Sequence, residues 1–136
     1  PIAGTVFPYA PAVTNSSAPC FSSPVGTVIL DFFGSPVLLH DAQIAASFVD
    51  SPATNLVNGL IKGFLTEADA KNTLMPAALP LIGGQPLSTL LPGGDSNCSS
   101  HNDMDINTGV SGWWFYLNFT ANRVVLTDLI FADGFE

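Results

Sequence analysis

The stretch VLLHDAQIAASF, residues 37–48, decides the fold class of this chain. One face of it holds Leu38, His40, Ala42, Ile44, Ala46 and Phe48, and the other holds Asp41, Gln43 and Ser47, with Val37 and Leu39 at its start. An apolar face that repeats every second residue predicts a half-buried β-strand. His40 is therefore predicted to be a core histidine with a hydrogen-bonded ring. Asp41 cannot orient it, because adjacent strand residues point to opposite faces.

Further strands are predicted on both sides of this one. Runs of β-branched and aromatic residues predict strands over 25–33, 56–65, 112–119 and 123–131. Within the second of these, the Asn58-Gly59 pair alternatively fits a tight hairpin turn. The run GWWFYLNF, residues 112–119, is apolar on both faces, so we expect this strand to be central in the sheet or to lie at an interface.

One short helix is predicted over residues 66–75. Thr66 suits the N-cap position, and Glu67 and Asp69 lie in the first turn, where the helix dipole favours negative charge. Pro76 ends the helix.

These elements predict a mainly β fold, either an antiparallel β-sandwich or an open sheet, with one short helix and long loops rich in Pro and Gly. Residues 1–24, rich in Pro and Ser, are predicted to form an extended N-terminal arm. Residues 25–136 are predicted to form a single β-rich domain.

Charged side chains are scarce and mostly acidic. They make up 10% of the chain, against about 25% in an ordinary soluble domain. The net charge is −8, and the cations are Lys62, Lys71 and Arg123. Because phosphate binding needs clustered basic residues, nucleic acid is excluded as a partner and an anionic membrane is disfavoured. No apolar run approaches the ~20 residues of a membrane span.

A surface with so few charges exposes apolar groups, and large exposed apolar patches mark interaction sites. The predicted partner is the chain itself, as a homo-oligomer or polymer. The side chains predicted to make the contact are Ile2, Val6, Phe7, Tyr9 and Trp114. A weakly charged but monomeric secreted domain is the alternative.

The loop HNDMDINTG, residues 101–109, carries oxygen ligands at alternate positions. Asp103, Asp105 and Asn107, with Asp95 as a fourth ligand, predict a Ca²⁺ site. The loop is not an EF-hand, because Thr108 stands where that loop has glycine. A solvated turn with Asx hydrogen bonds, or a transition-metal site that includes His101, are the alternatives.

Cys20 and Cys98 are predicted to form a disulfide, because they lie in separate loops without the spacing of a zinc or redox motif. Two free thiols in a reducing cytosol are the alternative. Glycosylation sequons occur at Asn15, Asn97 and Asn118, and they matter only in a eukaryotic secretory host. No nucleophile elbow or zinc-protease motif is present in the sequence, so the chain is predicted to be non-enzymatic.

The C-terminal sequence IFADGFE, residues 130–136, resembles a Phe-x-x-Gly-Phe-Glu ending found on secreted proteins of some proteobacteria. Residues 57–94, followed by GWWFYLNFTA, are similar to uncharacterised secreted bacterial proteins with that ending. The resemblance implies a secreted, extracellular or cell-surface location, and it implies no activity.

The sequence thus predicts an extracellular, non-enzymatic structural subunit that self-assembles into a filament or surface layer through apolar strands. The alternatives are a calcium-dependent extracellular binding module, with carbohydrate as a candidate ligand at one tryptophan, and an accessory part of a secreted hydrolase.

Overall fold

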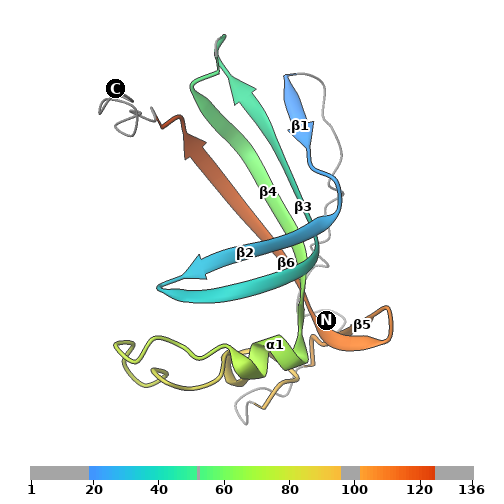
Figure 1. Cartoon of the computed structure of the whole chain (residues 1–136), viewed down its shortest axis with the longest axis vertical. Helices are drawn as coiled ribbons and strands as arrows, with labels where there is room; N and C mark the ends of the chain where they lie inside the picture. Colours follow the sequence, from blue (N-terminus) through green and yellow to red (C-terminus); the bar gives the residue numbers. More distant parts are fainter. Residues whose placement is uncertain (1–18, 52, 96–101, 125–136) are drawn as a thin grey trace, which may run out of the picture.

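The longest element of the fold is strand β3, Ser35–Val49, in a computed structural model that describes residues 19–51, 53–95 and 102–124. Up to Ala42, β3 pairs with β2, Gly26–Phe32. From His40 onward it pairs with β4, Asn55–Thr66. β3 therefore belongs to two layers, and Figure 1 shows its β2-paired part crossing in front of the long strands.

The change of layer takes place at Asp41. This residue has a φ of 46°, and the register between β3 and β4 shifts between His40 and Gln43. An extra residue in the left-handed region is a β-bulge, which bends its strand and strengthens the local twist. The bulge thus folds the β2–β3 hairpin over one face of the sheet.

The remaining strands complete an open, curled antiparallel sheet in the order β1-β3-β4-β6-β5, with β2 attached to β3 alone. β1 is Cys20–Ser22, β5 is Asp105–Asn107 and β6 is Val110–Asn122. With 56% of the described residues in strands and one short α-helix among them, the fold is mainly β, as predicted. Of the two predicted architectures, the described residues form the open sheet.

Helix α1, Glu67–Asn72, follows β4 directly. The Thr66 side chain accepts a hydrogen bond from the Asp69 N–H, which confirms the predicted N-cap. The helix ends three residues earlier than predicted because Thr73 turns to an extended conformation. The Thr73 carbonyl oxygen then accepts a hydrogen bond from the Leu87 N–H. Leu87 is the first residue of a short 3-10 helix, η1, which spans Leu87–Leu90.

The predicted faces of β3 are wrong over its first half. Val37, Leu39, Ala42 and Ala46 are buried. The bulge at Asp41 shifts the alternation by one residue, so the buried positions are odd before it and even after it. His40 consequently lies outside the core with its side chain 38% exposed, although its ring is hydrogen-bonded as predicted.

The Asn58-Gly59 pair is a second bulge and not a hairpin turn. Asn58 has a φ of 50°, and the register between β4 and β6 shifts between Leu56 and Gly59. A Cβ on Gly59 would stand 2.5 Å from the Phe119 carbonyl oxygen, so the close approach of β6 requires glycine here.

β6 confirms and extends the predicted strand 112–119, but it is central only at its start. β4 lies along one side of it. On the other side β5 pairs with residues 110–112, and no further described strand follows. Of the predicted strand 123–131, Arg123 and Val124 are described and lie outside the strands. The rest of it, and most of the predicted arm, fall outside the described residues.

Candidate functional site

The two faces of the sheet differ in polarity. Side chains that are paired across antiparallel strands lie on the same face. One face, termed the inner face, carries five pairs from β4 and β6: Leu65 with Trp113, Gly63 with Phe115, Ile61 with Leu117, Gly59 with Phe119, and Leu56 with Ala121. The opposite, outer face carries Phe64 with Trp114, Lys62 with Tyr116, and Leu60 with Asn118.

β3 and β1 add further apolar side chains to the inner face. Ile44 is paired with Ile61, and Phe48 with Leu56. Phe21 of β1 is paired with Ala46, and its ring centroid lies 5.5 Å from that of Phe48. The inner face is therefore apolar from β1 to β6.

The β2–β3 hairpin covers the inner face at the end nearest α1, termed the closed half. A Cβ on Gly63 would lie 2.8 Å from the Leu39 Cβ, which shows how closely the hairpin approaches β4. The buried cluster there is Val37, Leu39, Ala42, Leu65, Ala70, Met75, Leu87 and Trp113. The Trp113 indole N–H donates to the Pro92 carbonyl oxygen at 2.8 Å, so this tryptophan is part of the core.

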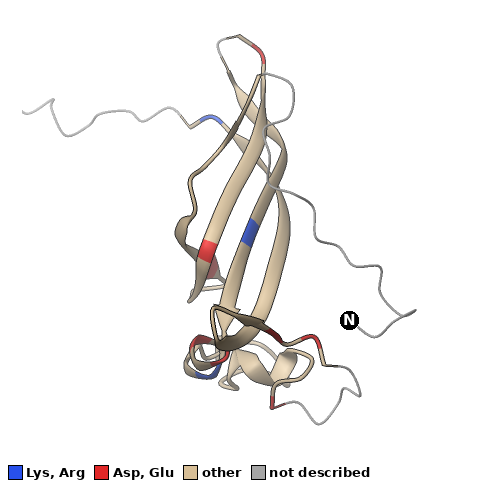
Figure 2. Cartoon of the chain, turned by 90° about the vertical axis from the view of Figure 1, so that its right-hand side faces the viewer, with Lys and Arg blue, Asp and Glu red and all other residues tan. Residues whose placement is uncertain are grey.

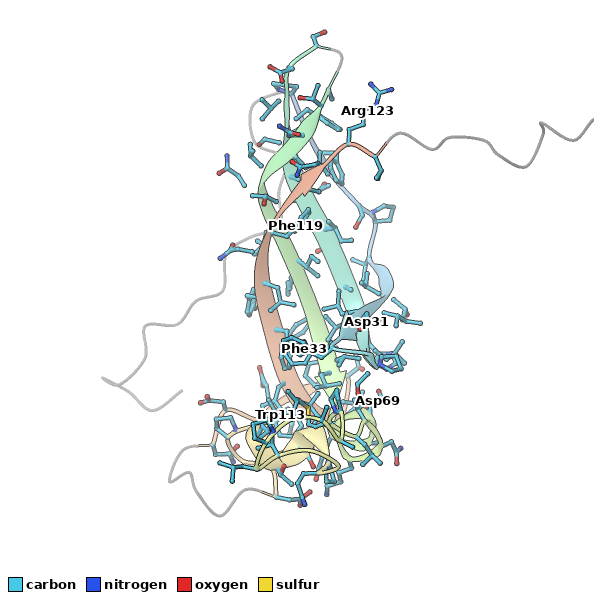
Figure 3. The ribbon with its side chains drawn as sticks, turned by 90° about the vertical axis from the view of Figure 1, so that its left-hand side faces the viewer. Asp31, Phe33, Asp69, Trp113, Phe119 and Arg123 are labelled. Carbon is cyan, nitrogen blue, oxygen red and sulfur yellow. The ribbon has the colours of Figure 1, made fainter. Side chains whose placement is uncertain are left out.

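Beyond the hairpin, the inner face continues as an apolar trough. We define the trough by Phe21, Ile44, Ala46, Phe48, Leu56, Phe119 and Ala121, and we term this end of the sheet the open half. Only Ala46 among them is fully buried. Figure 3 shows Phe119 between Trp113 at the α1 end and Arg123 at the far end.

The far end of the trough is a shallow apolar depression of about 270 Å³. Phe48, Leu56, Ala121 and Val124 line it together with the turn residues 53–55 and with Asn122 and Arg123. Phe48 is 37% exposed and Val124 is 82% exposed. None of the trough side chains is charged, and Figure 2 shows the acidic residues gathered mainly around the α1 end. The depression is therefore an apolar feature of the described surface that the hairpin does not cover.

The predicted association residue Trp114 lies on the outer face. The Lys62 ammonium lies 4.4 Å from the centre of its ring, and Phe64 packs edge-on with its centroid at 5.1 Å. These contacts occupy the ring within its own sheet, which leaves less of it for stacking on a sugar. The other predicted association residues, Ile2, Val6, Phe7 and Tyr9, lie outside the described residues.

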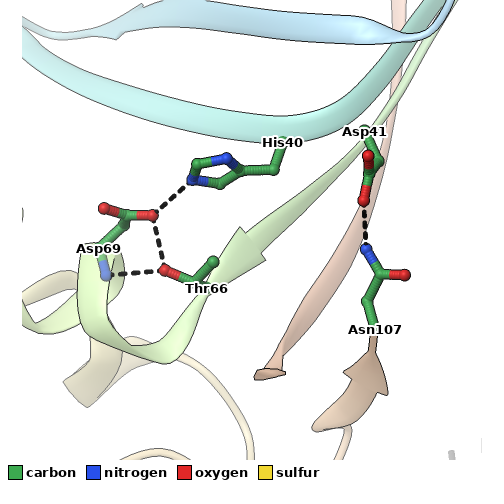
Figure 4. Close-up of polar contacts among 5 residues, drawn as sticks. All are labelled: His40, Asp41, Thr66, Asp69 and Asn107. Atoms are coloured by element: carbon green, nitrogen blue, oxygen red, sulfur yellow. Dashed lines mark hydrogen bonds and ion pairs between the residues drawn. The ribbon is translucent and has the colours of Figure 1, made fainter. Parts of the chain in front are cut away.

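A polar cluster joins β3 to α1 in the closed half (Figure 4). The His40 Nε2 lies 2.8 Å from the Asp69 Oδ2, and the Thr66 hydroxyl donates to the same oxygen at 2.6 Å. Burial disfavours the charged carboxylate, but the hydrogen bonds from Thr66 and His40 outweigh it, so the pKa of Asp69 lies below its ordinary value. The Thr66 hydroxyl is hydrogen-bonded to Asp69 and caps α1, so we interpret the cluster as a structural clamp.

The predicted calcium ligands are held by different partners. The Asn107 amide donates to Asp41 Oδ2 at 2.6 Å (Figure 4). Asp95 accepts from the Ser88 hydroxyl at 3.0 Å and lies 3.7 Å from the Lys71 ammonium. Asp103 and Asp105 are exposed. Over residues 19–51, 53–95 and 102–124, no group of three or more His, Cys, Asp or Glu side chains could hold a metal ion. Calcium binding at Asp103, Asp105, Asn107 and Asp95 stays a prediction.

The predicted disulfide also stays a prediction. Cys20 lies in β1, half-buried and paired with Ser47 of β3. Cys98 lies outside the described residues, as does His101.

Comparison with known proteins adds no relative: no protein-family model, no curated protein and no solved structure matches this chain significantly. In the part of the chain that the structure describes, no helix is long and apolar enough to cross a membrane.

Sequence reasoning missed the trough as a surface. Phe21, Leu56, Phe119 and Ala121 come from three strands, and only the strand register brings them to one face. The signal in the sequence is the alternation of Leu117, Phe119 and Ala121 with polar residues, which marks one apolar face of β6.

Proposed function

We propose that this chain is an extracellular, non-enzymatic structural subunit that associates with copies of itself through apolar strand surfaces. The observation that supports self-association is the half-covered inner face. A sheet with one apolar face is stable when another layer covers that face. Here the hairpin covers the closed half, and the trough in the open half needs a second surface. The extracellular location rests on the resemblance of the C-terminal sequence.

The charge pattern favours an apolar contact over ion pairing. The net charge of −8 makes two copies repel one another. The seven side chains that define the trough carry no charge, so burying them removes no charged group of theirs from water. Arg123, which lines the far end, is exposed. Association is therefore driven by hydrophobic burial, which contributes a free energy of roughly 25 cal/mol per Å² of apolar surface removed from water.

Sedimentation velocity of the full chain over a range of protein and salt concentrations tests this proposal. We expect oligomers that grow with protein concentration and become more stable as NaCl rises from about 0.05 to about 0.5 M, because salt screens the repulsion between acidic copies. An assembly held by ion pairs would weaken over the same range. A monodisperse monomer at high micromolar concentration would refute the proposed function.

A further inference from the structure

We infer that the trough of one copy receives residues 1–18 of a neighbouring copy. These residues are the part of the predicted N-terminal arm that precedes β1, and they are termed the arm below. This inference rests on the proposed self-association and names the two surfaces that meet. The trough supplies the acceptor. The arm supplies apolar side chains for it, namely Ile2, Val6, Phe7, Tyr9 and Val13.

The place where the arm joins the fold supports this assignment. The Phe48 N–H donates to the Pro19 carbonyl oxygen at 2.8 Å, so Pro19 is fixed beside a residue that lines the trough. Cys20 is paired with Ser47, close to the end of β3. The arm therefore begins at the open half of the sheet.

The length of the arm suits a neighbour. Its 18 residues reach roughly 60 Å when extended, at about 3.3 Å per residue. Strand β4, which runs the length of the sheet, has 12 residues and spans about 40 Å. The arm can thus leave its own copy and still lie along the whole trough of the next.

The composition of the arm suits packing on the face of a sheet better than hydrogen bonding to an edge strand. Pro8 and Pro11 lack the backbone N–H that pairing with an edge strand requires. Their neighbours Phe7 and Tyr9 are large apolar groups that can fill a trough without a continuous ladder. The arm also carries no charged side chain, and neither do the seven side chains that define the trough. The charged residue at the far end of the trough is Arg123.

The geometry of such a contact is head-to-tail. Arm and trough are different surfaces, and each copy carries one of each. Contacts between unlike surfaces close into a ring or continue as a filament, depending on the rotation between copies. Both outcomes agree with the proposed structural role.

Complementation between two full-length variants tests the inference. Phe7→Asp with Tyr9→Asp disables the arm and leaves the trough intact. Phe48→Glu disables the trough and leaves the arm intact. We expect each variant alone to be monomeric, with a Kd for self-association raised at least about 100-fold, since a charge must then be buried in an apolar contact. An equimolar mixture should form a 1:1 heterodimer, because one arm and one trough remain.

The matched control is Ile29→Glu, which places the same charge on an apolar side chain that is 67% exposed on β2, outside the trough. We expect this variant to assemble like the unmodified chain. Circular dichroism checks that each variant is folded. If Phe48→Glu is unfolded, Ala121→Glu disables the trough from β6 instead.

Three outcomes would overturn the inference. Either variant could assemble alone as the unmodified chain does. The mixture could stay monomeric, which would show that the arm of one copy does not enter the trough of another. Two troughs that pack face to face would instead let the arm variant assemble alone, because its trough is intact. In both cases the proposed function still holds if the unmodified chain assembles. A monomeric unmodified chain would overturn the proposed function as well.

Discussion

The closed and open halves of the sheet are built from the same strands and differ in what lies over them. β4 and β6 run through both halves with apolar pairs on the inner face. In the closed half, Leu39 of the hairpin is completely buried and Leu65 beneath it is too. In the open half, Phe48 and Val124 are exposed. The comparison shows that burial in this protein is set by the covering layer rather than by the hydrophobicity of the strand.

The largest expected difference between the halves comes from the same substitution made in each. Leu39→Ala in the closed half should lower the free energy of unfolding by about 2–5 kcal/mol, because it leaves a cavity in a packed core. Leu56→Ala in the open half should cost less than about 1.5 kcal/mol in the monomer, since its side chain is only half-buried. Urea denaturation at low protein concentration measures both. Equal losses would contradict the division into two halves.

The next largest loss of stability is expected where the hairpin packs closely on β4. Gly63→Ala adds a Cβ that would lie 2.8 Å from the Leu39 Cβ. The hairpin must shift to accept it, which we expect to cost about 1–3 kcal/mol. Gly26→Ala in β2 is the control, because nothing lies within 4 Å of its Cβ position. A Gly63→Ala protein as stable as the Gly26→Ala protein in the same denaturation experiment would show that the hairpin packs more loosely.

Loss of the helix cap should have a smaller effect. Thr66→Ala removes the hydroxyl that accepts from the Asp69 N–H and donates to the Asp69 carboxylate. Losing an N-cap costs about 0.5–2 kcal/mol. Thr120→Ala, at an exposed position of β6 in the open half, should change stability by less than about 0.5 kcal/mol. Thermal unfolding of the two variants compares them, and a similar melting temperature for both would argue against a stabilising role for the cap.

The smallest expected effect is a pH dependence confined to the closed half. The pKa of Asp69 is lowered in the folded chain, so its ionised form contributes stability above the pKa of the unfolded chain. That contribution is lost as the pH falls through the lower, folded pKa. The unmodified chain should therefore exceed Asp69→Asn in melting temperature at about pH 5, and the gap should shrink toward about pH 2.5. A gap of constant size would show that the carboxylate charge is not the cause.

Local signals in the sequence were reliable where a residue acts on its near neighbours. Thr66 caps α1 as predicted, because capping depends on a side chain and a backbone N–H three residues apart. The strand at residues 37–48 was predicted from a period-two pattern and the others from short runs of β-branched and aromatic residues, which are also local signals. The bulges were not predicted. Asp41 looks like an ordinary polar strand position in the sequence, and Asn58-Gly59 fits a strand or a hairpin turn. Both Asp41 and Asn58 have positive φ and shift the register.

The candidate site, too, was predictable from the sequence only in part. The sequence predicted that apolar strands would be available for association, and it selected Trp114 for that role. Trp114 lies on the outer face under Lys62, away from the trough, and its part in association stays a prediction. Which of two adjacent tryptophans enters the core depends on which face the hairpin covers. That choice is made by a bend at Asp41, more than 70 residues away in the chain.

By itself, the sequence determined the fold class, the single short helix with its cap, and the scarcity of charge. These follow from composition and from patterns only a few residues long. The tertiary structure alone decided which half of the inner face is covered and which is left as a trough. The reason is physical: the covering hairpin is placed by a bulge, and a bulge of one residue moves every later side chain to the other face.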